Sequence, residues 1–480
     1  MSADLVLAHG LVANADGRRV AHVVVDGGRI ADVVDAGQPV PEAARVIDAT
    51  GLVVMPGGVD GHCHIAQTTG PYTTLDDYAT TTTAALHGGT TTVLDFGIPA
   101  HAGETPLAAA LGKLDLAAAA RCDVALHASV VEWDETVPGQ LEELAARGIR
   151  SVKLYTTNRG TTMADGDTVL RTLREMARLD GLAYVHAEHD EIIVDCTQRH
   201  ADAGEIGIAE LPRTRPELAE EASVREVLAL AEYTGAGVYF VHQSTPGAVD
   251  LVTAARLGGQ AAFSETCPHY VALDSSVYAG PLPEFYACCP PMRDPETVAG
   301  LRERLLGGAV DTVASDHSCY SLDQKREHTD DIRQMPHGLP GVETRLPVTF
   351  TQMVGEGLDG LEDFVSVFAA APARLNGLRG KGAVAPGYDA DLVLVDPAAV
   401  RAVDGAALHM GTDFSPFEGL RLRGWPTAVV AGGRVVLDRD GFHDPGPAGR
   451  VLEQAPLSEA LSWGPLGAPA TESHAARSTR

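Results

Sequence analysis

The chain has 480 residues, 45% hydrophobic and 21% charged, a balance typical of a globular protein with one or two large cores. Asp and Glu outnumber Lys and Arg by 65 to 36, and the formal charge of −29 disfavours binding to nucleic acid or to anionic membranes. The start of the sequence lacks a basic and apolar leader, and no uncharged apolar run approaches the roughly 18 residues that span a bilayer. We therefore expect a cytoplasmic protein with no nucleic acid or membrane partner.

The cysteines are odd in number, scattered and without a CxxC pair, which argues against a disulfide framework and against a structural zinc site. We expect them to be small buried apolar groups. They are Cys63, Cys122, Cys196, Cys267, Cys288, Cys289 and Cys319.

Both ends of the chain have the pattern of short strands joined by glycine turns. Residues 1–55 contain "DLVLAHGLVANADG" and "RVAHVVVDGGRIADVVD", and the same texture returns in "ADLVLVDP" and "TAVVAGGRVVLDRDG" within residues 384–450. We expect these two segments to form one discontinuous β-sandwich that flanks the middle of the chain. Residues 451–480 are expected to be a C-terminal tail, of which 462–480 is either mobile or an arm on a neighbouring subunit.

Residues 56–383 alternate short apolar runs with segments of helical period. The segments 168–181 and 223–235 are examples, and each closes with a glycine as helices often do. Eight apolar runs alternating with helices predict an α/β fold, the (β/α)₈ TIM barrel, with its active site at the carboxyl ends of the strands. The runs are residues 52–62, 90–97, 123–130, 149–157, 182–188, 237–243, 260–268 and 311–318.

Ionisable residues of the kinds that bind metals end five of these eight runs. The spacing of the histidines in "GHCH" places both rings on one side of a strand, where they can share a cation. Singly, each residue has an ordinary explanation: a buried histidine, an ion-paired lysine or an aspartate that caps a helix. Their joint occurrence at strand ends in one register favours a metal site. The residues are His62, His64, Lys153, His186, His242 and Asp316.

Motifs in order along residues 5–445 resemble the amidohydrolase superfamily, and within it the cyclic amidases: dihydropyrimidinases, hydantoinases and allantoinases. They include "PGGVDGHCH", "SVKLYTT", "YVHAEHDEII", "ETCPHY", "CCPPMRDPET", "VASDHS" and "GLPGVETRLP". The resemblance implies a barrel with a flanking β-sandwich, a homotetramer, and a centre of two divalent metal ions, expected to be Zn²⁺. It also implies the ligands: His62, His64 and Asp316 for the first ion, His186 and His242 for the second, and Lys153, carboxylated with CO₂, between them.

The implied reaction is hydrolytic opening of a small cyclic amide. The ring would be a 5,6-dihydropyrimidine or a 5-substituted hydantoin, and the product an N-carbamoyl amino acid. The metal ions would activate a water, and Asp316 would accept its proton as general base and pass it to the leaving nitrogen as general acid.

Four positions expected to contact substrate include departures from the family pattern. Asn158 stands where a tyrosine is usual, and Tyr155, on the same strand face as Lys153, is either its replacement or a packed barrel residue. Cys289 replaces the usual serine before "PP", and His337 replaces the asparagine of the usual "PNG" segment. These changes predict retained hydrolysis with a shifted choice of substrate.

Several alternatives stay open. The motifs "ETCPHY" and "ASDHS" resemble those of allantoinases, so an allantoinase or another cyclic imide or amide hydrolase is the second candidate function. Ala66 stands where dihydroorotases carry an arginine, and Lys153 speaks against a mononuclear deaminase. Some animal relatives are non-catalytic scaffolds that have lost metal ligands, whereas this sequence keeps each ligand.

Overall fold

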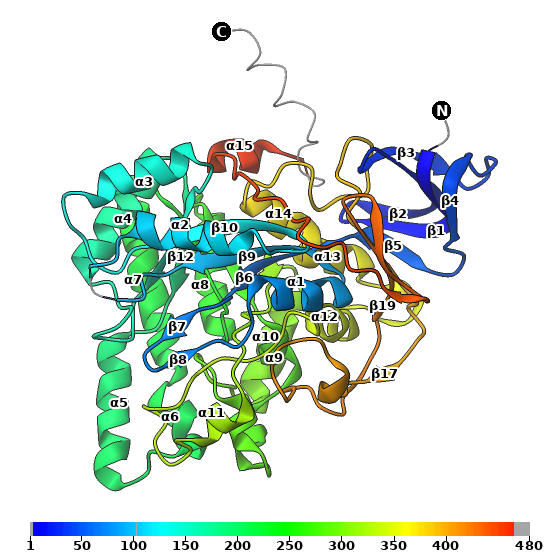
Figure 1. Cartoon of the computed structure of the whole chain (residues 1–480). Coiled ribbons are helices and arrows are strands. Elements are labelled where there is room, and N and C mark those ends of the chain that lie inside the picture. Colours follow the sequence, from blue (N-terminus) through cyan, green and yellow to red (C-terminus); the bar gives the residue numbers. More distant parts are fainter. Residues whose placement is uncertain (1–2, 102, 465–480) are drawn as a thin grey trace.

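The computed structural model describes residues 3–101 and 103–464 of the chain. Eight parallel strands form its centre, in the spatial order β15, β14, β13, β12, β11, β10, β9, β6 (Figure 1). Their bounds are β6 (Gly58–Cys63), β9 (Thr90–Gly97), β10 (Asp123–Ser129), β11 (Ser151–Tyr155), β12 (Leu182–His186), β13 (Gly237–Phe240), β14 (Ala262–Thr266) and β15 (Thr312–Val313).

The first and last strands of this sheet approach each other. Cys63 at the end of β6 pairs in parallel with His317, which follows β15, and the backbone N–H of His64 donates to the His317 carbonyl at 2.7 Å. The sheet is thus a nearly closed barrel, and the predicted fold class is confirmed. Its strands are buried along their whole length, as parallel strands covered by helices are.

The first predicted run, residues 52–62, is divided between two sheets. β5 (Val53–Pro56) pairs antiparallel with β16 (Leu392–Val395) outside the barrel, and the barrel strand β6 begins only at Gly58. Gly57 stands at the change of sheet, where an added Cβ would lie 2.2 Å from the side chain of Thr91. The apolar run was continuous because both strands are buried.

Helices cover the outside of the barrel between consecutive strands (Figure 1). The longer ones are α1 (Tyr78–His87), α2 (Pro106–Ala117), α3 (Val137–Ala146), α4 (Gly166–Arg178), α5 (Asp190–Ala203), α7 (Glu217–Thr234), α8 (Pro246–Leu257), α10 (Pro295–Leu306) and α12 (Arg345–Met353). Short helices are α6 (Leu211–Thr214), α9 (Pro268–Ala272), α11 (Leu322–Arg326), α13 (Leu361–Val365), α14 (Ala371–Leu375) and α15 (Leu457–Ser462).

Of the two helices predicted to close with glycine, α7 does so. Gly235 follows it with a left-handed backbone, φ 73°. After α4 the left-handed residue is Asp180 at φ 54°, and Gly181 comes one position later. Among the described residues, no helix combines the length and apolar character that crossing a membrane requires.

Strands from both chain ends form a second sheet, which lies beside the barrel (Figure 1). Its path is β21, β20, β19, β16, β5, β1, β2, β3, with β4 paired to β1. Many apolar side chains of these strands pack into a cluster of their own, whereas others, such as Val53, Met55 and Val393, belong to the cluster of the barrel core. The remaining bounds are β1 (Ala3–Asn14), β2 (Gly17–Asp26), β3 (Arg29–Asp35), β4 (Ala43–Asp48), β19 (Pro426–Ala431), β20 (Arg434–Asp438) and β21 (Gly441–Phe442). We retain the division at residues 55/56, 383/384 and 450/451 as a proposal.

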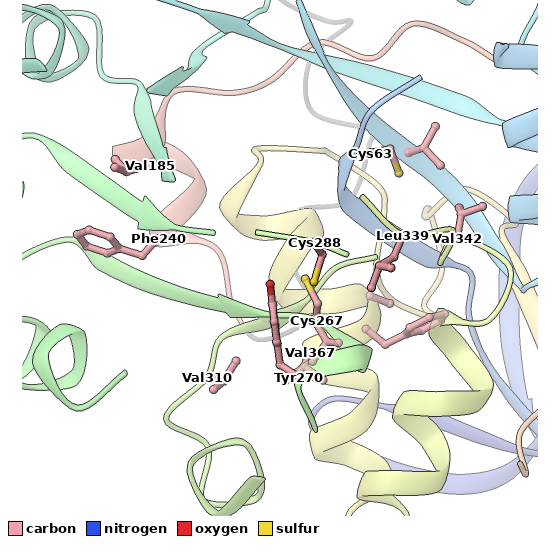
Figure 2. Packing of buried hydrophobic residues seen from close by; sticks show 14 of the residues in the cluster. Cys63, Val185, Phe240, Cys267, Tyr270, Cys288, Val310, Leu339, Val342 and Val367 are labelled. Carbon is pink, nitrogen blue, oxygen red and sulfur yellow. The ribbon is translucent and has the colours of Figure 1, made fainter. Parts of the chain in front are cut away.

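Residues far apart in sequence pack at the barrel core (Figure 2). Tyr270 and Cys288, for example, both donate to the carbonyl of Pro290, at 2.6 and 3.1 Å. All seven cysteines lie in the described part of the chain and all are free. Six are buried as predicted, whereas Cys289 is partly exposed.

The segment 449–463 crosses the amino-terminal end of the barrel, and we call it the C-terminal strap. Backbone hydrogen bonds of 2.8 Å join it to the barrel at Val124, Gly148 and Asp180. The predicted mobile tail or arm at 462–480 lies outside the described residues from 465 onward.

A buried ammonium group holds the barrel to the second sheet. Lys381 Nζ lies 2.5 Å from Asp123, which begins β10, and 3.2 Å from Asp389, and it also contacts Asp391, which precedes β16. Arg450 of the C-terminal strap pairs with Asp123 and Asp389. Because the three carboxylates are buried, they depend on these cations.

We expect Lys381→Met to lower the free energy of unfolding by about 3–5 kcal/mol, since it leaves buried carboxylates without their main counter-ion. Urea denaturation measures this loss. Arg147→Ala is the control, because it removes an exposed pair with Glu143 and costs at most about 0.5 kcal/mol. Equal stability of the two variants would contradict the role given to Lys381.

Candidate metal centre

The strand-end residues come together at one end of the barrel. β6 carries His62 and leads to His64, Lys153 lies in β11, His186 ends β12, and His242 and Asp316 follow β13 and β15. All but His62 line a cavity of about 590 Å³, and His62 is buried among them. The loop strands β7 (Thr68–Thr69) and β8 (Tyr72–Thr73) lie at this end of the barrel (Figure 1).

Three of these side chains form a compact first group. His62 Nε2 lies 3.1 Å from Asp316 Oδ1 and 3.3 Å from His64 Nε2, and His64 Nε2 lies 3.3 Å from the same oxygen. On its other side, His62 Nδ1 donates to Glu265 Oε1 at 2.7 Å. The Nε2 atom of a neutral His62 therefore carries a lone pair, and it faces other electron-rich atoms. Such a donor set fits a divalent cation.

His186 and His242 form the second group. Their facing atoms, His186 Nδ1 and His242 Nε2, are 2.9 Å apart. His186 Nε2 donates to Glu188 Oε2 at 2.7 Å, and Arg215 holds the same carboxylate at 2.5 Å. The lone pair of His186 Nδ1 thus also points into the site, in the arrangement that a carboxylate imposes on metal-binding histidines.

Lys153 lies beside both groups and is completely buried. Its Nζ is 3.5 Å from His62 Nε2, and it lies 4.8 and 5.0 Å from the ring centres of Phe96 and Tyr155. Burial lowers the pKa of Lys153 to about 8, although the charge of Asp316 opposes the shift. The neutral amine is therefore a minority form at neutral pH, but a much larger one than for a lysine in water.

The imidazoles of His62 and His242 are neutral for the same reason. Burial, reinforced by Lys153, holds the pKa of His62 well below its usual range, and burial with His186 does the same for His242. Burial raises the pKa of Asp316, but His62, His64 and Lys153 together outweigh it, so the net shift is downward. The site thus combines the neutral imidazoles of His62 and His242 with an ionised carboxylate, the states in which these groups bind metals.

Two of the residues have a backbone that their side chains disfavour. His242 has φ 39° and Asp316 has φ 48°, both in the left-handed region. Left-handed residues other than glycine are uncommon and are found often at functional sites. Here the left-handed turn lies at a strand end, where it directs the side chain into the cavity.

Sequence reasoning missed the carboxylates that orient the histidines. Glu265 in β14 accepts from His62 Nδ1, from the backbone N–H of His242 at 3.0 Å and from the Tyr239 hydroxyl at 2.7 Å. Burial raises the pKa of Glu265 to about 7. Its place in the predicted run 260–268, and the position of Glu188 two residues after His186, were the available signals.

The four expected substrate contacts all line the same cavity: Tyr155, Asn158, Cys289 and His337. Cys289 Sγ lies 2.8 Å from His337 Nδ1, so these two departures from the family pattern are neighbours. Tyr155 lies next to Lys153 and its ring centre is 5.5 Å from that of His186. Asn158 has a left-handed backbone with φ 72°.

The sequence matches the model of the Amidohydrolase family over residues 53–436. The chain belongs to the amidohydrolase family. It is 34% identical over 441 residues to a D-hydantoinase of Rhizobium radiobacter, covering 91% of this chain and 95% of that one. Among solved structures, D-hydantoinase from Bacillus sp. AR9 has a TM-score of 0.90 at 31% identity. The match covers 94% of this chain and 99% of that one. Dihydropyrimidinase from Brevibacillus agri also has a TM-score of 0.90 at 31% identity, with coverage of 94% and 98%.

Metal dependence is general in the amidohydrolase family, and the described residues include a group of ligands that fits it. In this amidohydrolase Glu265 acts on both groups, because it orients the His62 ring and binds the backbone of His242. Glu265→Gln replaces an acceptor by an amide that also presents N–H donors.

We expect Glu265→Gln to weaken metal binding by about 10- to 100-fold, the usual effect of losing such a partner. Competition with a chromophoric chelator measures the affinity. Tyr239→Phe is the matched control, since it removes another donor to the same carboxylate and leaves the His62 contact in place. Unchanged affinity in Glu265→Gln would show that Glu265 does not orient His62.

Proposed function

We propose that this amidohydrolase opens a cyclic amide ring, with 5,6-dihydropyrimidines or 5-substituted hydantoins as substrates and N-carbamoyl amino acids as products. The observation that carries the proposal is the convergence of imidazole nitrogens and one carboxylate at the end of the barrel cavity. The names of the relatives, D-hydantoinase and dihydropyrimidinase, support the choice of ring.

We assign His62, His64 and Asp316 to one divalent ion and His186 and His242 to a second. Lys153, carboxylated on its amine, is the ligand shared by both, and zinc is the expected metal. Its lowered pKa supports this role, because CO₂ adds only to a neutral amine. When bound, the two ions would lower the pKa of a water and polarise the substrate carbonyl.

Asp316 is the proposed general base and acid. Its carboxylate is ionised and borders the cavity beside His62 and His64, so it can accept a proton from the attacking water. The same oxygen can then return that proton to the ring nitrogen as the amide bond breaks. The left-handed backbone at Asp316 holds the carboxylate at this edge.

The cavity wall favours an uncharged ring. Burial raises the pKa of Cys289 to about 12 and lowers that of His337 to about 3, so this pair meets the substrate as neutral hydrogen-bonding groups. Arg215 is neutralised by Glu188, and Arg333 at the cavity mouth by Asp331 at 2.7 Å. Ala66 stands where dihydroorotases carry an arginine. Both described arginines that line the cavity already have a carboxylate partner, so neither is free to bind a carboxylate on the ring. A neutral hydantoin or dihydropyrimidine fits better than dihydroorotate.

The altered contacts at Asn158, Cys289 and His337 keep an allantoinase or another cyclic imide hydrolase as the second candidate. Assembly into a homotetramer and a cytoplasmic location also stay predictions.

The test is ring opening by metal-loaded protein across dihydrouracil, hydantoins with small and aromatic 5-substituents, allantoin and succinimide. We expect turnover of dihydrouracil or of hydantoins. Asp316→Asn supplies the background, and it should keep the fold while losing turnover, because an amide accepts no proton. Turnover of allantoin or succinimide alone would favour the second candidate, and no turnover by protein that holds two metals per chain would contradict the substrate class.

Lys153→Ala should lose most of the bound metal and reduce turnover by at least about 100-fold, since the shared ligand is gone. Elemental analysis and the substrate panel measure the two losses. Lys153→Met serves as the control for packing, because it fills the space beside Phe96 and Tyr155 but has no amine. Full metal content and activity in either variant would refute the role of Lys153.

A further inference from the structure

Strand β6 contains an irregularity at Gly61 and His62. Asp60 pairs with Val93 of β9, and Cys63 pairs with Asp95, so three steps along β6 correspond to two along β9. Gly61 and His62 fall between the two paired positions. This is the count of a β-bulge, a feature that bends a strand and redirects a side chain, often beside active sites.

A side chain from a different strand holds the bulge. The carbonyl oxygen of Gly61 lies 3.1 Å from Nε2 of His127, which belongs to β10. His127 is completely buried and stacks on Phe96, with ring centres 4.6 Å apart and an angle of 21°. Phe96 in turn meets the edge of the His62 ring at 4.9 Å. The backbone and the ring of His62 are therefore both in contact with groups that His127 supports.

The hydrogen bonds of His127 can run in one direction only. A carbonyl oxygen accepts, so Nε2 must donate to Gly61. Burial lowers the pKa of His127 to about 3, so the ring is neutral and its Nδ1 accepts from the Ser151 hydroxyl at 2.6 Å. The single O–H of Ser151 then donates to His127, so Ser151 Oγ acts as the acceptor for Gln454 Nε2 at 2.8 Å. Gln454 Oε1 is left to accept from the backbone N–H of Arg150 at 2.7 Å.

This chain of hydrogen bonds crosses the barrel from one end to the other. Gln454 belongs to the C-terminal strap, and its own N–H donates to the Gly148 carbonyl at 2.8 Å. Helix α15, which follows Gln454, lies across the barrel from β7 and β8 at the cavity end (Figure 1). Ser151 begins β11, two residues before Lys153. The chain thus joins the strap to the two strands that carry His62 and Lys153.

We propose that His127, oriented by Ser151 and Gln454, is a positioning residue that holds the β6 bulge and thereby directs His62 toward the metal. Through Gln454 the C-terminal strap, remote from the cavity, sets the affinity for the ion that His62 binds. The inference rests on the proposed role of His62 as a ligand.

The competing explanation is that the chain only satisfies buried polar groups. It predicts that breaking the chain lowers the stability of metal-free protein and leaves metal affinity unchanged. Positioning predicts a change in affinity, concentrated on the ion bound by His62, His64 and Asp316. The His127 ring also packs on Tyr184 of β12, with ring centres 4.3 Å apart, but the hydrogen bonds that link Gly61, His127, Ser151 and Gln454 include no residue of β12 or β13.

The test compares Co²⁺ binding by chelator competition in three full-length variants, with the melting temperature of each metal-free protein. His127→Phe keeps the stacked ring and removes both nitrogens. Gln454→Met keeps the length of the side chain and removes the donor to Ser151. Ser458→Ala is the matched strap control, because it removes the hydroxyl contact to Asp180 and leaves Gln454 in place.

We expect His127→Phe to weaken one of the two ions by about 10-fold and to leave the other unchanged. Gln454→Met should act in the same direction to a smaller extent, and Ser458→Ala should bind as wild type does. If His127→Phe does not fold, the Co²⁺ affinity of Gln454→Met alone tests the inference.

Wild-type affinity in a folded variant with a lower melting temperature would overturn the inference, and so would equal weakening of both ions. Wild-type protein that binds no Co²⁺ would refute the proposed function itself, and the inference with it. A measurement on wild type therefore separates the two failures.

Discussion

The site depends on a buried carboxylate, Glu265, which accepts a hydrogen bond of 2.7 Å from His62 Nδ1. That bond fixes which ring nitrogen keeps a lone pair and turns it toward His64 and Asp316. Because the same carboxylate binds the backbone of His242, it also ties β14 to the second group of ligands. Glu188 does for His186 what Glu265 does for His62, with Arg215 as its counter-ion.

Lone pairs held face to face repel one another, and the surrounding structure must oppose that repulsion. The left-handed residues His242 and Asp316 add local backbone strain at the same place. A rigid barrel can hold such a site, since its strands are buried along their length and Lys381 joins them to the second sheet. Preorganised acceptors then bind a cation without further reorganisation.

The convergence of the strand-end residues could be predicted because each follows an apolar run, and the parallel strands of a barrel end on the same side. Pairing between the two ends of the chain could be expected from their shared strand pattern, but which strands pair could not. The run at 52–62 gave no sign that β5 would pair with β16 some 340 residues later, in a different sheet. Glu265 was missed because its place in the run 260–268 does not show that it contacts the His62 ring, and the pairing of Cys289 with His337, 48 residues apart, needed the fold.

In barrel enzymes the catalytic residues usually lie at the carboxyl ends of the strands, and the residues at the amino-terminal end mainly stabilise the fold. Here hydrogen bonds from Gln454 through Ser151 and His127 reach the bulge beside His62, so the two ends share one set of buried polar groups. Hydrogen bonds link each member to the next, and a change at one place removes the partner of a buried group at the next. A substitution in the C-terminal strap can therefore act on the site without touching the cavity.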